Sequence, residues 1–440
     1  MDSSAPTGDY RTTYLDTGSN PVNMKAVVCA CVSAVLLISA VAISAESKNA
    51  GDTVVLIADR AFDGTGRTLR NVRIQVNDGK IATLSGPASG TVIDLRGYTV
   101  LPGWIDAHVH IASHFDGTGH LATSSEPPAD ATLEMAEGAW QTLMAGFTTI
   151  QSVGDPSELP LRDAIRDHNF PGPRLFTSLA PIEGDLSKAT PDALRAMVRE
   201  RKAQGADLVK IFASNSQRVG AKPTLTEEQL KTLCDEAAAV GLRSMVHAYR
   251  GQVAAAARAG CREIEHATYA TPEELQVAVQ AGAYITPQVG LVVQNYIENQ
   301  QRYIGIDGYT AEGMTVMLRD MPEDFAVCKR LAHLPRARMV FGTDATAGAH
   351  GHNAEEFIGR VQHCGQDTMA ALVSANSVAA EAIGMGGELG RLAPGYAADI
   401  IALDGDPLQD ITAVRRVVFV MRGGKIYKWA GSHAERRLTH

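Results

Sequence analysis

The sequence has no run rich in lysine or arginine, and charged residues make up only 20% of its 440 residues. Acidic residues outnumber basic ones by 49 to 40, which gives a net charge of −9. Such a chain would repel a nucleic-acid backbone, so nucleic acid is a poor candidate partner. Hydrophobic residues reach 45%, which argues against disorder and is enough for one large α/β barrel and a smaller unit.

Cysteine is scarce as well, with six residues in the chain. Cys29 and Cys31 lie in an apolar run near the N-terminus, and the other four form no Cys-x-x-Cys pair. This spacing favours buried thiols over metal ligands or a disulfide framework. The four cysteines concerned are Cys234, Cys261, Cys328 and Cys364.

The N-terminal part of the chain has the pattern of an export signal. Residues 24–45 begin with Met-Lys and continue as an apolar run, with Ala40-Val41-Ala42 as a small-x-small cleavage site. Residues 1–23 form a polar extension before it. We expect a periplasmic or secreted protein with no stable membrane insertion after cleavage. The alternative is a membrane anchor, because residues 26–45 are long enough to span a bilayer.

Short β patterns occur at both ends of the remaining chain. One hairpin is indicated around the turn Asn77-Asp78-Gly79, and a second around Gly423-Gly424. We expect residues 52–101 and 388–430 to assemble one small β-sandwich from the two termini. Residues 102–387 would then be a domain inserted in it.

The inserted middle alternates strand-like runs with helices. Helix start and stop signals bound residues 190–205, 226–241 and 271–282. The pattern predicts an α/β fold in which a (β/α)8 TIM barrel has its active site where the strands end. The eight candidate strands are Trp104–Ile111, Phe147–Val153, Arg174–Ala180, Leu208–Ala213, Arg243–Tyr249, Glu263–Thr268, Tyr284–Val289 and Met339–Ala345.

Two histidines mark the end of the first candidate strand. His108 and His110 are two residues apart, so their side chains point to the same face of the strand and can hold one metal ion. Neutral imidazole is a common zinc ligand, but an isolated His-x-His pair also occurs by chance in many proteins. The pair therefore needs support from the rest of the chain.

Four more polar residues lie at strand ends, each with an ordinary alternative. Lys210 could be an ion-paired core lysine, and His247 and His266 could be hydrogen-bonded core residues. Asp344 could cap the helix that follows it. Taken together with the His-x-His pair, these alternatives need six separate coincidences of residue type and strand position.

This set of residues resembles the amidohydrolase superfamily. The matching segments are Pro-Gly-Trp-Ile-Asp-Ala-His-Val-His, Val-Lys-Ile-Phe-Ala, Val-His-Ala-Tyr and Phe-Gly-Thr-Asp-Ala. They are most similar to the imidazolonepropionase-like peptidases, which include Xaa-Pro dipeptidases (prolidases) and carboxypeptidases, and to enzymes that hydrolyse the amide of ochratoxin A. The resemblance runs from about residue 53 to residue 428.

The resemblance implies two divalent metal ions, of which zinc fits the nitrogen-rich ligands best. His108, His110 and Asp344 would hold one ion, and His247 with His266 the other. Lys210 would be shared as N6-carboxylysine, because a neutral amine can take up carbon dioxide. A hydroxide bridging the metals would then attack the substrate carbonyl.

The resemblance also implies catalytic roles. Lys210 supports the metals, and Asp344 takes the proton of the attacking water and passes it to the leaving nitrogen. Tyr249 would bind the terminal carboxylate of the substrate, although a tyrosine packed against the barrel rim fits the pattern equally well. Arg250, on the opposite face of the strand, is a weaker candidate for the same role.

Three other histidines are candidate substrate-binding residues. His350 and His352 lie in a glycine-containing segment that we interpret as a mobile loop over the site. His114 follows the first strand. For all three, an ordinary solvated loop is the alternative.

The favoured function is hydrolysis of the amide bond to a C-terminal amino acid, in a dipeptide or an N-acyl amino acid. The alternatives are hydrolysis or deamination of cyclic amides or heterocycles, as in imidazolonepropionase, and a non-catalytic metal-binding barrel. The partner would be a small-molecule amide or dipeptide. Relatives of this kind are often homo-oligomers, octamers among them, so we expect a homo-oligomer.

Overall fold

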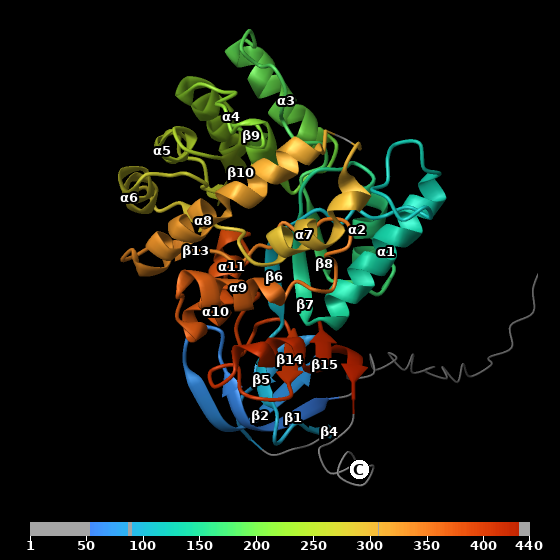
Figure 1. The fold of residues 1–440 in the computed structure, drawn as a ribbon. Helices are drawn as coiled ribbons and strands as arrows, with labels where there is room; N and C mark the ends of the chain where they lie inside the picture. The colour runs from blue at the N-terminus through green and yellow to red at the C-terminus, as the bar shows by residue number, and fades with distance from the viewer. Residues whose placement is uncertain (1–52, 87–89, 307, 431–440) are drawn as a thin grey trace, which may run out of the picture. The chain divides into compact units, whose positions relative to one another are not determined.

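The computed structural model describes residues 53–86, 90–306 and 308–430. The predicted polar extension, the predicted signal segment and the two cysteines within it lie outside the described residues. Within the described ranges, no helix combines the length and apolar character needed to cross a membrane. The architecture is α/β, with parallel sheets, helices outside them and a separate mixed sheet (Figure 1).

Strands from the two ends of the described chain pair in one mixed sheet. Its order is β16-β15-β14-β5-β1-β2-β3, with β4 paired to β1. The strands are β1 (Val54–Phe62), β2 (Thr68–Asn77), β3 (Lys80–Thr83), β4 (Thr91–Asp94), β5 (Thr99–Pro102), β14 (Ile400–Leu403), β15 (Val417–Arg422) and β16 (Lys425–Trp429). Both predicted hairpins are confirmed. The hydrogen bonds define a single sheet in the described residues, so the two separate layers of a sandwich are not established.

The central strand β14 shows why this sheet has apolar side chains on both faces. Ile400 and Ala402 belong to a core cluster formed by the terminal sheet itself. Ile401 and Leu403 belong to another cluster, which also contains Trp104. Successive side chains of a strand point to opposite faces, so the unbroken apolar run joins the sheet to the middle of the chain.

Seven of the eight predicted strands of the middle are present at shorter lengths, whereas the eighth, predicted at Met339–Ala345, is observed as Arg338–Met339 and shares only Met339 with the prediction. The observed strands form two parallel sheets, in the orders β6-β7-β8 and β13-β12-β11-β10-β9. Isolated parallel bridges, Val109 with Ala345 and Ile182 with Ile211, link the two sheets. The strands are β6 (Trp104–Val109), β7 (Phe147–Ser152), β8 (Arg174–Thr177), β9 (Leu208–Phe212), β10 (Arg243–Ala248), β11 (Glu263–His266), β12 (Tyr284–Thr286) and β13 (Arg338–Met339).

Helices lie outside these strands (Figure 1). The predicted caps are confirmed, since the side chain of Thr190 accepts a hydrogen bond at a helix start, and Thr226 and Thr271 form capping boxes. The helices are α1 (Pro128–Met144), α2 (Glu158–Asp167), α3 (Pro191–Ala203), α4 (Glu227–Ala239), α5 (Gln252–Arg258), α6 (Pro272–Gln280), α7 (Leu291–Tyr303), α8 (Ala311–His333), α9 (Glu355–Cys364), α10 (Thr368–Ser374) and α11 (Ser377–Ala382), with 3-10 turns η1 (Gln217–Val219) and η2 (Ile411–Arg415).

The prediction of free cysteine thiols is wrong. Cys234 is bonded to Cys261 and Cys328 to Cys364, with Cα atoms 5.3 and 5.4 Å apart. All four are buried, as expected. The partners are 27 and 36 residues apart in sequence. One bond joins α4 to the segment just before β11, and the other joins α8 to the end of α9. Local spacing carries no sign of such a pairing.

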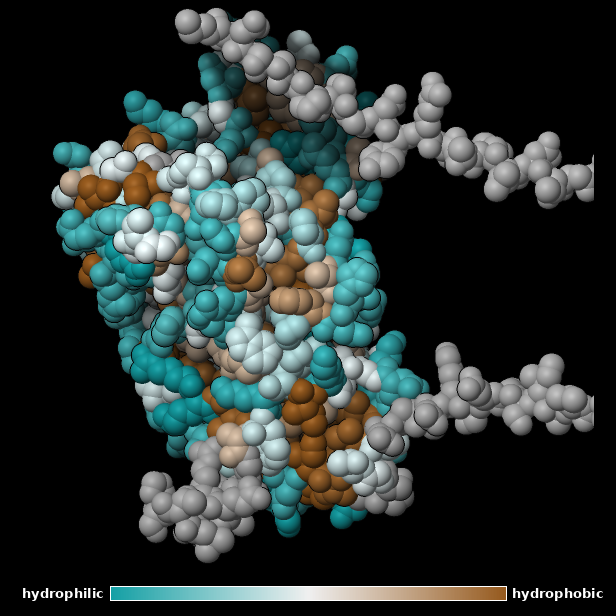
Figure 2. All heavy atoms as spheres, turned by 90° about the vertical axis from the view of Figure 1, so that its right-hand side faces the viewer, coloured by the Kyte–Doolittle hydropathy of each residue, from teal (hydrophilic) through white to brown (hydrophobic). Residues whose placement is uncertain are grey.

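The surface of the described residues is mostly polar on the face shown in Figure 2, with apolar residues in separate groups. Exposed large apolar side chains include Leu133 and Trp140 on α1 and Trp429 on β16. Exposed side chains of this kind are common on folded proteins and do not by themselves identify a partner.

Candidate metal centre

The predicted ligands meet at one cavity of about 570 Å³. They come from β6, β9, β10, β11 and the segment after β13, although they are spread over more than half of the sequence. Tyr249 lines the same cavity. The ligands are His108, His110, Lys210, His247, His266 and Asp344.

Backbone hydrogen bonds place Asp344 beside the two histidines of β6. The amide of Asp344 donates to the carbonyl of His108 over 2.8 Å, and the amide of His110 donates to the carbonyl of Ala345 over 2.8 Å. Asp344 has φ +56° and His266 has φ +66°. Such a conformation costs a non-glycine residue about 1–3 kcal/mol, and it persists where the surroundings hold it, often at functional sites.

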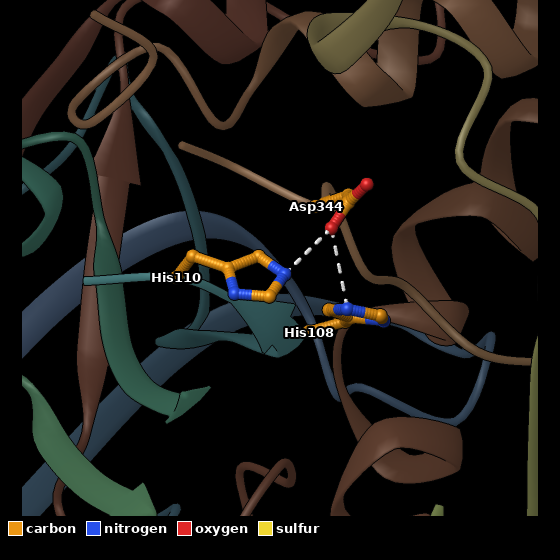
Figure 3. Close-up of side chains that lie close together, drawn as sticks. All are labelled: His108, His110 and Asp344. Atoms are coloured by element: carbon orange, nitrogen blue, oxygen red, sulfur yellow. Dashed lines mark ion pairs between the residues drawn. The ribbon is translucent and has the colours of Figure 1, made fainter. Parts of the chain in front are cut away.

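His108, His110 and Asp344 form a compact group of ligand atoms (Figure 3). Oδ1 of Asp344 lies 3.2 Å from Nε2 of His108 and 3.0 Å from Nε2 of His110. One ligand atom from each residue lies within 4.8 Å of the others. Burial acts to raise the pKa of Asp344, but its contacts with the two imidazoles hold that pKa well below its usual value. Two nitrogens and one anionic oxygen facing each other can hold a divalent metal ion.

Lys210 lies next to this group. Its side chain is 1% exposed, and Nζ is 3.2 Å from Nε2 of His108. No ion pair joins it to a carboxylate in the described ranges. Burial lowers the pKa of Lys210. A buried ammonium is costly, so burial shifts Lys210 toward its neutral form.

His247 and His266 form a second group of nitrogens. Their ring centroids are 4.4 Å apart. Burial lowers the pKa of His266 to about 3 and that of His247 well below its usual value, so both imidazoles are neutral. Nε2 of His247 is buried and has no hydrogen-bond partner among the described residues. Buried polar atoms are nearly always satisfied, so this nitrogen is suited to an additional ligand.

Two residues that the sequence analysis missed orient His108. Oε2 of Glu265 lies 2.6 Å from Nδ1 of His108, and Gln288 donates from Nε2 to the same oxygen over 2.8 Å. The carboxylate fixes the proton on Nδ1 and leaves the lone pair of Nε2 directed at the site. Glu263 and Glu265, two carboxylates in a buried strand, were the available signal in the sequence.

Tyr249 lies beside the second histidine group. Its ring centroid is 4.7 Å from that of His247, and its hydroxyl accepts a hydrogen bond from the amide of Gln217 over 3.4 Å. Burial raises the pKa of Tyr249, so its hydroxyl is neutral. Arg250 is exposed, and its Nε donates to the carbonyl of Tyr269.

The three other candidate histidines lie outside the lining of this cavity. His114 contacts Glu126 over 2.5 Å, and His350 contacts the carbonyl of Ser113 over 2.9 Å. His352 is exposed. The segment predicted to be a mobile loop is anchored, because its buried Asn353 donates to Asp106 over 2.7 Å.

Comparisons with known proteins identify the family of this chain. The model of the Amidohydrolase family matches residues 99–427. Ochratoxinase from Aspergillus niger is 25% identical over 439 residues, covering 88% of each chain.

Two solved structures are also similar. A Xaa-Pro dipeptidase with methionine bound in its active site has a TM-score of 0.76 at 26% identity, over 86% of this chain and 100% of that chain. A prolidase complexed with N-methylphosphonate-L-proline has a TM-score of 0.75 at 27% identity, with the same two coverages. The family match covers most of the sequence. The chain therefore belongs to the amidohydrolase family and is a hydrolase that acts on carbon–nitrogen bonds.

Proposed function

We propose that this protein is a binuclear metal-dependent amidohydrolase that cleaves the amide bond to a C-terminal amino acid. The observation that carries the proposal is Lys210, a buried amine that lines one cavity with two groups of metal-ligand type and has no ion pair among the described residues. One group is His108, His110 and Asp344. The other is His247 with His266.

The residues present fit a pair of divalent ions. The first group brings three ligand atoms within 4.8 Å of one another. The second contains Nε2 of His247, which is buried and has no hydrogen-bond partner in the part of the chain that the structure describes. The donor set is rich in neutral imidazole, which favours zinc.

Lys210 would connect the two groups after addition of carbon dioxide. The neutral amine attacks the carbon, a new nitrogen–carbon bond forms, and one proton leaves to give a carbamate with two anionic oxygens. The reaction would remove the basic amine of a side chain that has no carboxylate partner in the described ranges. The carbamate oxygens would also add the negative charge that two dications require.

When bound, the two ions would polarise a substrate carbonyl and lower the pKa of a water molecule to roughly 7. Asp344 then acts as the proton carrier: it accepts a proton from the attacking water and delivers it to the leaving nitrogen. Protonation is needed because an amine anion leaves poorly. Glu265 keeps His108 in the required tautomer, and Tyr249 can donate its hydroxyl hydrogen to a carboxylate of the substrate.

The named relatives support a substrate that ends in an amino acid. One neighbouring dipeptidase holds methionine in its active site, and a neighbouring prolidase holds an analogue built on proline. We extend this class to N-acyl amino acids, including ochratoxin A, because of the likeness to ochratoxinase.

The proposed architecture is a closed (β/α)8 barrel over residues 102–387. The bridges from Val109 to Ala345 and from Ile182 to Ile211 support closure. Residues 52–101 and 388–430 would together form one small β-sandwich. The two disulfide bonds favour an oxidising compartment, which supports export.

A substrate panel tests the proposed function. Dipeptides, N-acyl amino acids, ochratoxin A and cyclic amides are given to the purified protein before chelation, after chelation and after zinc is restored. We expect hydrolysis of the first three classes only, lost on chelation and recovered with zinc. Lys210→Ala should be inactive, whereas Lys202→Ala, at an exposed position, should behave as the unaltered protein. Turnover that survives chelation, or cleavage of cyclic amides alone, contradicts the proposal.

A further inference from the structure

Arg218 is a cation in the cavity that the metal centre does not use. It lies on η1, the turn that follows β9, and lines the same cavity as the predicted ligands. Its guanidinium carbon is 3.8 Å from the ring centroid of Tyr309. The guanidinium has no ion pair and no hydrogen bond to any residue that the structure describes.

Arg218 and Lys210 are the lysine and arginine side chains among the residues that line the cavity. Lys210 lies against His108, in the metal centre. Arg218 is therefore the one cation of this lining that is left for an anionic substrate. Burial acts to lower the pKa of Arg218, but the neighbouring phenols and Asp344 raise it overall, so the side chain stays charged.

The turn that carries Arg218 is held in place on two sides. Gln217 donates from its amide to the hydroxyl of Tyr249 over 3.4 Å, and from Nε2 to Asp324 on α8 over 3.4 Å. A side chain at Gly313 of α8 would come within 3.1 Å of Cβ of Arg218. The contacts of Gln217 and the close approach of α8 therefore hold Arg218 in place. Arg218 directly follows Gln217, the residue that contacts Tyr249.

Apolar side chains from two helices complete this part of the cavity. They include Val292, Val293 and Tyr296 of α7 and Met317 and Leu318 of α8. We call these five residues the apolar wall. Tyr309, which lies between the two helices in sequence, provides the ring under the guanidinium. A large apolar group can be buried here beside a fixed positive charge.

We propose that Arg218 binds the free carboxylate of the amino acid released by hydrolysis, and that the apolar wall takes the side chain of that amino acid. The substrate class is then a dipeptide or N-acyl amino acid with a free carboxylate and a large apolar C-terminal residue. A planar guanidinium can form two parallel hydrogen bonds to a carboxylate, and Tyr249 can add a third. This inference rests on the proposed function for the direction of cleavage.

A purely structural arginine would also stack on Tyr309 and tie η1 to α8. The two roles predict different effects of an Arg218 substitution on two substrates. A carboxylate-binding arginine discriminates between a free acid and its amide, whereas a structural arginine affects both substrates alike. The test therefore compares N-acetyl-L-phenylalanine with N-acetyl-L-phenylalaninamide.

The variants are Arg218→Gln, which keeps length and removes charge, and Arg218→Lys, which keeps charge and removes the two-pronged geometry. The matched control is Arg258→Gln, an exposed arginine on α5 that does not line the cavity. For Arg218→Gln we expect KM for the acid to rise by about 10- to 100-fold, the range for losing a charged hydrogen bond, with kcat changed little. Kinetics with the amide should be unchanged, and Arg218→Lys should lie between.

Binding of L-phenylalanine and L-phenylalaninamide, measured by calorimetry, gives a readout without turnover. The inference is supported if L-phenylalanine binds only when Arg218 is present and L-phenylalaninamide does not depend on Arg218. This result would hold even if no substrate is hydrolysed, so the inference can be tested separately from the proposed function. Equal loss with acid and amide, or no loss, overturns it while leaving the hydrolase intact. Melting curves check folding, and where Arg218→Gln does not fold, the same comparison is made with Arg218→Lys.

Discussion

The cavity has two ends that are built differently. At the metal end, the side chains come from strands and the segments directly after them. The amide of Asp344 donates to the carbonyl of His108, and the carboxylate of Glu265 accepts from Nδ1 of His108, which fixes their orientation. At the substrate end, Arg218 and the apolar wall come from a 3-10 turn and two helices. Loops and helix faces tolerate changes of sequence better than a packed strand. In the proposed assignment, the metal-binding residues are held rigidly, and substrate selectivity lies in the part of the cavity whose sequence can vary.

The largest effect is expected from the proton carrier of the metal end. Asp344→Asn keeps a ligand oxygen but cannot accept the proton, so kcat should fall by about 10²- to 10⁴-fold for every substrate, with most of the metal retained. Steady-state kinetics with elemental analysis measures both. A near-normal rate would remove Asp344 from the mechanism, and a loss confined to one substrate would place it at the substrate end.

A smaller effect is expected for Glu265, which contacts the predicted ligand His108 and is not itself a predicted ligand. Glu265→Gln weakens the hold on His108 and should lower zinc affinity by about 10- to 100-fold, as loss of such a partner does in other metal sites. Competition with a chromogenic chelator measures this affinity. The control is Glu134→Gln, an exposed position on α1. Unchanged zinc affinity in Glu265→Gln would mean that the backbone alone orients His108.

Removing the disulfide bonds one at a time tests the difference between the two ends of the cavity, because each bond stabilises one end. Cys328–Cys364 joins α8, which carries part of the apolar wall, to α9. Replacing both cysteines with serine should lower the free energy of unfolding by about 3 kcal/mol, because the unfolded chain gains freedom. Urea unfolding measures the loss.

The matched control for that variant is the double replacement at Cys234 and Cys261, which are bonded beside β11 of the metal end. We expect a similar loss of stability there. KM should rise more in the variant that loosens α8. A larger rise of KM in the control would reverse the assignment of the two ends.

A separate effect, on the pH dependence of stability, concerns Glu158, a buried carboxyl that accepts a hydrogen bond from Ser152 over 2.6 Å. Burial raises its pKa from 4.5 to about 8. Between these pH values the native protein retains a proton that the unfolded chain releases, so stability should fall as pH rises.

Urea unfolding of the wild-type protein and of Glu158→Gln, at pH 5 and pH 8, measures this dependence. The variant should show a smaller difference between the two pH values, and Glu134→Gln should not. A variant that keeps the full pH dependence would mean that other groups cause it.

The metal end could be predicted because its ligands lie in regular strands or in the short segments that directly follow them. Two residues of spacing place His108 and His110 on one face, and strand order brings Lys210 and Asp344 to the same rim. The positive φ of His266 and Asp344 could not be predicted, since non-glycine residues rarely adopt it.

The substrate end could not be predicted, because its contacts are tertiary. Nothing around Arg218 in the sequence indicates that its guanidinium would stack on Tyr309, 91 residues later in the numbering (309 − 218). The paired cysteines were missed for the same reason. His114 and His350, selected for their residue type near strand ends, make hydrogen bonds outside the cavity lining.

The central claim is that Lys210 joins two metal ions. The most direct measurement is the number of zinc equivalents bound per chain after zinc loading and removal of excess metal, in the wild-type protein and in Lys210→Ala. We predict two in the wild-type protein and one or fewer in the variant. Equal zinc content in both proteins, or no bound zinc in the wild-type protein, would contradict the claim.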